Sequence, residues 1–268
     1  MKLHMKVHLS EAYKNHQVLG EIEDMKALYE NLSFRAMRFV ASGTKCIFNY
    51  ETYVFMSIQG TLDSIKTLLL IGRITDAFVL ARKVFDDILT EIYLSIELKD
   101  KYDVFHNSIV EDVQQWLEAS CRIPSIKKIL KTLETSAHTK KLYPYFGWKT
   151  YLEHNRKILD DCVHSNRYSR MLLNCNTVYL PDKREKQLDG MSALLKQLMM
   201  IQVAFVFHLS PQYMMASYYF DCLDVGETPP EEALSWVAPY AQTAFDKYIR
   251  SNESLADFIK STCYLKIQ

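Results

Sequence analysis

Acid, imidazole and amide side chains near the middle of the chain form its clearest chemical pattern. Asp160 and Asp161 precede His164 by four and three positions. Leu159 and Val163 supply apolar anchors four residues apart, so the spacing predicts one helix with the two carboxylates and the imidazole on adjoining strips. Such carboxylates can accept a hydrogen bond from the imidazole, fix its tautomer and favour its charged form. The pattern predicts an acid/base device or, alternatively, a half-buried histidine satisfied by its helical neighbours.

Helices are expected to position these groups. Of the 268 residues 49% are apolar, and only seven glycines and seven prolines interrupt the apolar periodicity. No Asn-Gly or Asp-Gly pair lies between two segments of strand-like alternation. The sequence therefore predicts an all-α fold with a core large enough for the chain to fold alone.

Periodicity, caps and breakers place the expected helices along the chain. A first helix is expected at about 10–31 with Ser10 as N-cap, and a second at about 50–71 ends at Gly72. The second forms an antiparallel hairpin with a long helix that ends near residue 98. Further helices are expected at about 109–119, 125–133, 150–168, 185–209, 212–223 and 231–250, the last with Thr228 as N-cap. The aromatic connector at 142–148 is expected to pack against the protein rather than to stack on nucleic-acid bases.

Charge and cysteine content limit the classes of partner. Thirty-two basic residues balance thirty-two acidic ones, so any contact with RNA must be made by a local cleft rather than by a general positive field. Six scattered cysteines form no metal-binding or redox motif, and reduced thiols are expected. The first ten residues lack the apolar segment of a signal peptide, so a cytoplasmic location is expected. The apolar run 198–209 is too short to cross a bilayer of about 30 Å, so it predicts a central core helix. No association with a membrane is expected.

Two segments carry a resemblance to a known family. The first is Gly72-(x)3-Asp76-Ala77-(x)2-Leu80-Ala81-Arg82-(x)3-Asp86, and the second is Leu159-Asp160-Asp161-Cys162-Val163-His164-Ser165-Asn166. Together they resemble the paired signatures of HEPN-like helical proteins, which occur in bacterial abortive-infection and toxin systems, and of an uncharacterised group with a similar Val-His-Ser-Asn segment. The segments 170–174, 213–217 and 236–239 are also similar to that group, so the resemblance covers about residues 50–250.

The resemblance implies a fold, a partner and a chemistry. It implies an HEPN-like helical bundle at 46–268, with additional C-terminal helices and an N-terminal helical extension at 1–45. It also implies a homodimer that cleaves RNA, for example transfer RNA, with no metal or cofactor. In such a reaction His164 would act as acid or base, Ser165 and Asn166 would hold the phosphate or the ribose 2′-OH, and an arginine would neutralise charge.

The arginine is harder to assign, because seven residues separate Arg156 from His164 where the family usually has about four to six. On a helix the two would lie about 12 Å apart along the axis and roughly 80° around it. Arg167 and Arg170 are local substitutes, and Arg82 is a candidate from another helix that also has the spacing of an ordinary ion pair with Asp86. The catalytic candidates are His164, Arg156, Asp160 and Asp161, and the substrate-binding candidates are Arg82, Ser165, Asn166, Arg167 and Arg170.

Two classes of function remain. The common nucleotide, zinc-protease and hydrolase signatures (GxxxxGK[ST], GxGxxG, HExxH and GxSxG) are absent from the sequence. The first class is a ribonuclease-type effector of phage defence or of a toxin system. The second is a non-catalytic helical adaptor or subunit, which binds a protein partner from the same defence or toxin system and uses the His164 region only structurally.

Overall fold

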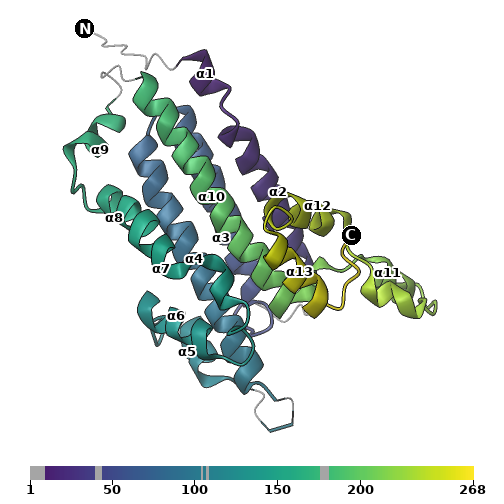
Figure 1. Cartoon of the computed structure of the whole chain (residues 1–268). Coiled ribbons are helices and arrows are strands. Elements are labelled where there is room, and N and C mark those ends of the chain that lie inside the picture. The colour runs from purple at the N-terminus through teal and green to yellow at the C-terminus, as the bar shows by residue number, and fades with distance from the viewer. Residues whose placement is uncertain (1–9, 40–43, 104, 107–108, 176–180) are drawn as a thin grey trace.

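The protein is a helical bundle. The computed structural model describes residues 10–39, 44–103, 105–106, 109–175 and 181–268. Four long helices run side by side, namely α2 (Val18–Phe39), α3 (Tyr50–Leu70), α4 (Ile74–Lys101) and α10 (Pro181–Leu209) (Figure 1). Within the described ranges no β-strand forms, and one isolated bridge pairs Met215 with Val237. The expected all-α class is therefore confirmed.

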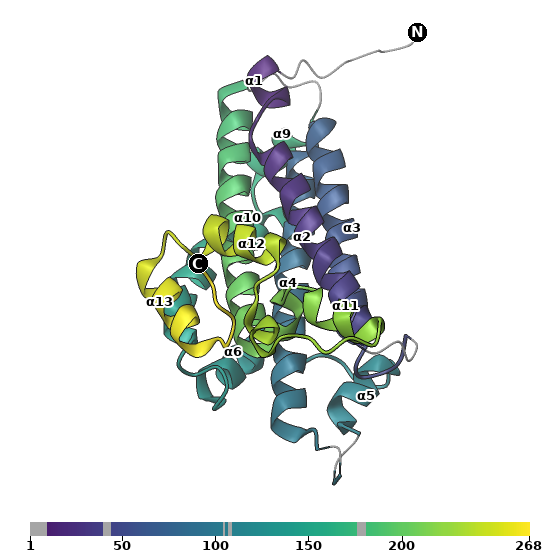
Figure 2. The same ribbon diagram turned by 90° about the vertical axis from the view of Figure 1, so that its right-hand side faces the viewer.

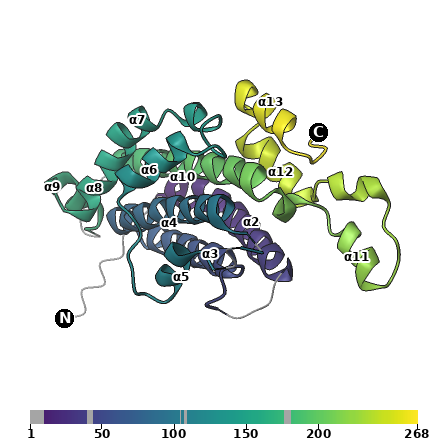
Figure 3. The same ribbon diagram turned by 90° about the horizontal axis from the view of Figure 1, so that it is seen from below.

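Shorter elements surround the four long helices. The short α-helices are α1 (Glu11–Lys14), α5 (Glu111–Leu117), α6 (Ile126–Thr135), α7 (Trp148–Tyr151), α8 (Lys157–Val163), α9 (Tyr168–Leu173), α11 (Tyr218–Asp224), α12 (Pro239–Tyr248) and α13 (Glu253–Thr262). The 3-10 turns are η1 (Tyr143–Phe146), η3 (Pro211–Met214) and η4 (Glu231–Ser235), and η2 (Leu152–Arg156) is a π-helical turn. Seen from below, α6, α7 and α8 lie on one side of the bundle and α11 projects from the other (Figure 3).

The α3–α4 hairpin forms as the sequence predicts. Gly72 has a φ of 77°, and its N–H donates to Leu69 O at 2.9 Å, while Arg73 N donates to Leu68 O at 2.8 Å. These are the bonds of a helix end closed by a left-handed glycine, which lacks the Cβ that would clash there. The buried Arg184 of α10 also donates to Gly72 O at 3.1 Å, so the turn is fixed from outside as well.

The core helix α10 is also confirmed, although it begins earlier than expected. A proline at its first position is compatible with a helix start, because that position has no intrahelical partner for an N–H. Among the described residues, the stretch Lys183–Leu209 is the one helix long and apolar enough to cross a membrane by length and composition, and 72% of its apolar window is buried inside the protein. That burial agrees with the expected place of the helix at the centre of the bundle.

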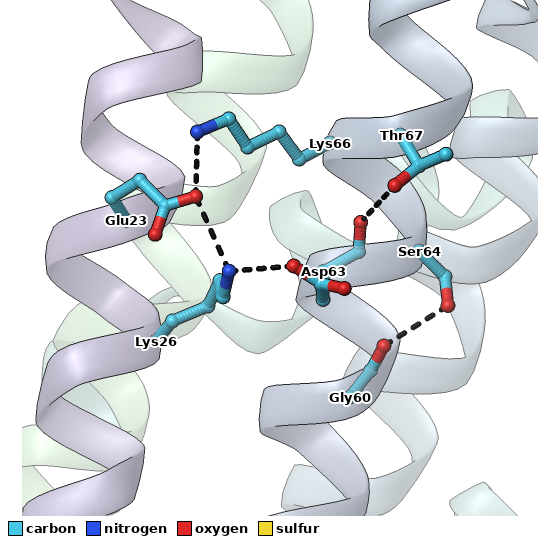
Figure 4. A network of polar contacts seen from close by, with 7 residues as sticks. All are labelled: Glu23, Lys26, Gly60, Asp63, Ser64, Lys66 and Thr67. Carbon is cyan, nitrogen blue, oxygen red and sulfur yellow. Dashed lines mark hydrogen bonds and ion pairs between the residues drawn. The ribbon is translucent and has the colours of Figure 1, made fainter.

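Helix α2 belongs to the same core. Its buried Val18, Ile22, Met25, Tyr29 and Leu32 form one apolar cluster with side chains of α3, α4 and α10, and Figure 2 shows α2 alongside α3. Polar pairs follow the outer edge of this contact. Lys26 contacts Asp63 at 2.5 Å, and Lys66 contacts Glu23 at 2.5 Å (Figure 4). Because these pairs are partly solvated, the buried apolar faces contribute most of the stability of the contact.

Three expected helices outside the His164 segment are wrong in their boundaries, and the one expected at 212–223 is divided into η3 and α11 by the extended backbone of Met215. The helix expected at 10–31 is divided: Ser10 caps α1 by accepting from Tyr13 N at 3.0 Å, and His16 Nδ1 then accepts from Val18 N at 3.2 Å to start α2. The helix expected at 231–250 with a Thr228 cap is also divided. Pro239 cannot donate a backbone hydrogen bond and disfavours helical geometry in the residue before it, so α12 begins there after the η4 turn.

The aromatic connector, the C-terminal helix and the cysteines complete the comparison with the sequence. The aromatic connector packs as expected, with Phe146 stacked on Phe205 at 5.4 Å between ring centroids and Trp148 buried. An additional C-terminal helix, α13, is capped by Asn252, which accepts from Leu255 N at 3.2 Å. None of the six cysteines forms a disulfide, which agrees with the reduced thiols that the sequence predicts.

Replacing Gly72 tests the hairpin turn. Gly72→Ala should lower the free energy of unfolding by about 1–2 kcal/mol, because a Cβ disfavours the left-handed backbone. Gly60→Ala is the matched control: Gly60 lies inside α3 with open space at its Cβ position, so alanine should stabilise by roughly 0.5–1 kcal/mol. Urea unfolding followed by circular dichroism measures both, and equal effects of the two substitutions would contradict the assignment.

Candidate functional site

A π-helical turn positions the predicted catalytic segment. α7, η2 and α8 follow one another without a break, and the π turn between Leu152 and Arg156 carries more residues per turn than an α-helix. π turns of this kind occur frequently at functional sites. The turn is followed by α8, which packs against α4. The π turn therefore lies directly before the face on which Asp160 meets α4.

Asp160 is the centre of an ion-pair cluster between α4 and α8. Arg82 of α4 donates from NH1 to Asp160 Oδ1 at 2.6 Å and from Nε to both oxygens of Asp86 at 3.1 Å. Arg156 adds a longer contact from Nε to Asp160 Oδ2 at 3.5 Å. The Arg82 side chain is only 14% exposed, and its guanidinium lies 5.8 Å from the centre of the Phe85 ring. These contacts fasten α8 to α4 and occupy both arginines.

Asp161 makes a separate ion pair. Arg167 Nε lies 2.7 Å from Asp161 Oδ2, and the Asp161 side chain is largely buried. Arg167 occupies the N-cap position of α9, so the pair spans the connection between α8 and α9. Both aspartates that were expected to serve the imidazole are therefore engaged by arginines.

His164 lies at the end of its helix rather than inside it. α8 ends at Val163, His164 is the C-cap with its N–H donating to Asp160 O at 3.0 Å, and Ser165 has a φ of 52°. The expected helix through residue 168 is thus wrong, because the left-handed Ser165 turns the chain away. His164, Ser165 and Asn166 are exposed, and within the described part of the chain the His164 ring makes no hydrogen bond or ion pair. The expected carboxylate–imidazole bond is absent from these contacts.

The two segments that carry the family resemblance meet in space. Asn174 Oδ1 accepts from Thr75 N at 2.9 Å, and its amide nitrogen donates to Asp76 at 2.6 Å, so a residue beyond α9 caps the N-terminus of α4. The Thr75 hydroxyl also donates to Arg170 O at 2.5 Å. Together with the Arg82–Asp160 pair, these bonds place α8 and α9 along the first half of α4.

A basic pocket lies between α9 and α10, close in the chain to the exposed His164. Its volume is about 280 Å³, and its lining side chains belong to Arg167, Ser169, Arg170, Leu172, Leu173, Lys183, Lys186 and Gln187. Four of these carry positive charge and none is acidic. His164 precedes Arg167 by three residues, so their Cα atoms are within roughly 11 Å. The pocket therefore offers cationic and amide donors to an anion near the imidazole.

Sequence reasoning found half of this pocket. Arg167 and Arg170 were among the substrate-binding candidates, and both line the pocket, Arg167 from the N-cap of α9 and Arg170 from within that helix. Lys183 and Lys186 were missed because the chain up to residue 184 was expected to be a break before the core helix. The signal was a matching spacing, since Arg167 and Arg170 at the start of α9 and Lys183 and Lys186 in α10 each lie three positions apart.

A buried carboxyl pair forms a second polar centre that the sequence did not reveal. Ser95 Oγ lies 3.0 Å from Glu51 Oε1, 3.0 Å from Glu91 Oε1 and 3.0 Å from the Tyr50 hydroxyl. Glu51 belongs to α3, whereas Glu91 and Ser95 belong to α4. The Tyr213 hydroxyl donates to Glu51 Oε2. Gln202 Nε2 donates to Glu91 Oε2 at 2.9 Å. Four segments of the bundle therefore meet at these two carboxyl groups.

Ser95 determines the proton count of the pair. A hydroxyl has one proton to donate and two lone pairs that accept. Ser95 can therefore donate to only one carboxyl group, and the other must carry a proton and donate to Ser95 for both contacts to be favourable. Burial raises the pKa of both Glu51 and Glu91, and the negative charge of Glu51 adds to the rise at Glu91, whose pKa reaches about 8. At neutral pH Glu91 is accordingly the protonated member.

The shared proton predicts a pH dependence of stability. The pKa of Glu91 rises from the ordinary 4.5 to about 8 on folding, so the folded state binds the proton more tightly than the unfolded state. Protonated Glu91 therefore makes its whole contribution to the free energy of unfolding below pH 4.5. This contribution is lost as the pH rises through 8, and the free energy of unfolding decreases by at most about 1.4 kcal/mol per pH unit. Urea titrations between these limits should show the decline.

Glu91→Gln should flatten that profile, because the amide imitates the protonated carboxyl and does not titrate. Glu30→Gln, at an exposed position of α2, is the control and should leave the profile unchanged. The titratable groups that interact with Glu91 are Glu51 and Tyr50 from α3, Tyr29 from α2, and Tyr213 from η3. A Glu91→Gln variant with an undiminished decline would contradict the assignment of the proton.

A double-mutant cycle tests the Arg82–Asp160 contact. If it fastens α8 to α4, Arg82→Ala and Asp160→Ala should show a coupling free energy of about 0.5–1 kcal/mol in urea unfolding, a modest value because Asp160 is partly solvated. The exposed pair Lys14–Glu11 is the matched control and should show little coupling. Zero coupling between Arg82 and Asp160 would remove the structural role given to this ion pair.

The chain matches no protein-family model, no curated protein and no solved structure. The resemblance to HEPN-like proteins therefore stays a prediction that rests on the sequence segments quoted above. Any function must be argued from the residues described above, among which the exposed His164, close in the chain to a basic pocket, is the arrangement with the clearest chemical use.

Proposed function

We propose that the protein is an HEPN-like, ribonuclease-type effector that cleaves RNA by metal-independent acid/base chemistry, in phage defence or in a toxin system. One observation carries the proposal: the exposed His164 precedes by three residues Arg167, which lines a pocket with four basic side chains and no acidic one. An RNA backbone needs cations for its phosphates and a titratable group near its 2′-hydroxyls. Because the chain has no net charge, this local pocket is the feature that would attract RNA.

The proposed reaction assigns a role to each group. The ribose 2′-oxygen attacks the adjacent phosphorus, its proton passes to a base, and the departing 5′-oxygen receives a proton as the P–O bond breaks. His164 serves one of these proton transfers. Arg167, Arg170 and the two lysines of α10 hold the phosphate and stabilise the added negative charge. Ser165 and Asn166, exposed beside His164, bind the neighbouring ribose or phosphate oxygens.

The ion pairs change the roles first expected for three residues. Arg82 and Arg156 are occupied by Asp160, so in the proposed mechanism all three position α8 and do not contact RNA. Asp161 pairs with Arg167 at the pocket, but the Arg167 side chain is 59% exposed and therefore stays accessible to a phosphate. One imidazole can serve only one proton transfer at a time, so we propose that a second copy of the chain supplies the other. Sedimentation equilibrium with a mass of two chains would agree with this homodimer.

A second candidate function is a non-catalytic adaptor that binds a protein partner from the same system. One observation favours it: large apolar side chains are exposed along the projecting α11–η4 arm, among them Tyr218, Leu223, Val225, Leu234 and Trp236. Exposed apolar patches frequently mark protein interaction sites. In this case the ion pairs near His164 would serve only the packing of α8 and α9.

Replacing His164 separates the two functions. Purified protein incubated with total or transfer RNA in EDTA should produce cuts, and His164→Ala should reduce their rate at least about a hundredfold while the circular dichroism spectrum stays unchanged. His106→Ala is the control, because His106 is equally exposed but lies on the α4–α5 connection, where it pairs with Asp103. Intact RNA together with a stable protein complex would favour the adaptor.

The basic pocket is tested by the same assay at several salt concentrations. Lys183→Ala combined with Lys186→Ala should weaken RNA binding and reduce its dependence on salt, because phosphate contacts release counterions. Lys127→Ala with Lys131→Ala, on the exposed face of α6, is the matched control. Equal losses in both double variants would show that the pocket has no special part in binding.

A further inference from the structure

A second pocket lies at the other end of the bundle, where α3 begins and α4 and α10 end. Its volume is about 340 Å³, which lies within the range of small-molecule sites. The side chains that line it belong to Ile47, Phe48, Glu51, Ser95, Leu98, Lys99, Tyr102, Leu209, Ser210, Gln212 and Tyr213. The His164 region contributes none of them, so this pocket is separate from the site proposed for RNA.

The inner end of this pocket is acidic. Glu51 and Ser95 are each more than nine-tenths buried and nevertheless form part of the wall. The oxygens of Glu51 accept from the hydroxyls of Ser95, Tyr213 and Ser210. Within the described residues no Lys, Arg or His lies within ion-pair distance of this carboxylate. A buried carboxylate without a cation is costly, and a ligand that brings a positive charge would relieve that cost.

The outer end of the pocket is basic. Lys99 is exposed and makes no ion pair to the described residues, although its charge lowers the pKa of Glu51 somewhat against the larger effect of burial. Lys99 follows Ser95 by one helical turn, so about 6 Å separates the two residues along α4. The pocket therefore presents a negative group inside and a positive group at its mouth.

Much of the remaining lining of the pocket is apolar and aromatic. Ile47, Leu98 and Leu209 contribute aliphatic surface. The Phe48 and Tyr102 rings meet edge to face with their centroids 5.2 Å apart. Such a surface suits an apolar body of one ring or a branched chain, which gains free energy by leaving water. The ligand must then combine this body with two opposite charges.

We propose that this pocket binds a small zwitterion with an apolar body, of the size of a large hydrophobic amino acid, with its ammonium group at Glu51 and its carboxylate at Lys99. A simple amine would satisfy Glu51 but would be repelled by Lys99. A simple acid would satisfy Lys99 but would be repelled by Glu51. Only a molecule with both charges complements both ends, because electrostatic complementarity selects against singly charged partners.

Three related probes test the proposal by isothermal titration calorimetry. L-phenylalanine carries both charges, 2-phenylethylamine lacks the carboxylate, and 3-phenylpropanoate lacks the ammonium group. L-phenylalanine should bind with saturation below about 10 mM and should raise the melting temperature, and each singly charged analogue should bind at least about tenfold more weakly. L-leucine, with a branched body, should also bind.

Variants of the two charged residues locate the binding site. Lys99→Met should remove the preference for L-phenylalanine over 2-phenylethylamine, and Glu51→Gln should remove the preference over 3-phenylpropanoate. Lys127→Met, on α6, is the control and should behave as the unmodified protein does. Because Glu51→Gln alters a buried network and can unfold the chain, the surface variant Lys99→Met decides the question by itself.

The outcomes that overturn the proposal are distinct. It fails if neither L-phenylalanine nor L-leucine binds below about 10 mM, or if the three phenyl probes bind with equal affinity. It also fails if Lys99→Met leaves the preference for the zwitterion intact. Loss of RNA cleavage in a His164 variant has no bearing on this pocket, so the two proposals stand or fall separately.

Discussion

Burial of α4 is the constraint on which the rest of the structure depends. Its buried side chains between Ile74 and Ile96 pack among α3, α10, α6, α8 and α9. Because the helix is surrounded, the polar groups it carries must find partners on neighbouring helices. Arg82 does so on α8, Thr75 beyond α9, and Glu91 on α3 and α10. Each proposed site is thus attached to this one helix.

The polar contacts of α4 differ in energetic character along its length. Near the first half the Arg82–Asp160 pair is partly solvated, so it orients α8 without adding much stability. Deeper in the bundle Glu91 and Glu51 share a proton, and their burial makes the arrangement sensitive to pH. The His164 ring makes no such contact within the described residues, which suits a group that exchanges protons with a ligand.

Local sequence signals predicted the backbone well where they acted within one element. The left-handed glycine at residue 72 and the apolar repeat of α4 gave the hairpin, and the apolar run before Leu209 gave the core helix. They failed where a side chain competes with a helix. His16 starts α2, Ser165 ends α8, and Pro239 divides the expected last helix, because each changes which backbone groups are hydrogen-bonded.

The sequence alone determined the helical class, the hairpin and the candidate residues near His164, because these follow from periodicity and short-range spacing. Only the tertiary structure decided which groups are partners. Arg82 and Asp160 are 78 positions apart, and Glu51 reaches Glu91 only through Ser95. The pairing of distant side chains is fixed by how helices pack, not by local propensity. For that reason the aspartates meet arginines rather than the imidazole, and the acidic pair inside the bundle came to light only in the fold.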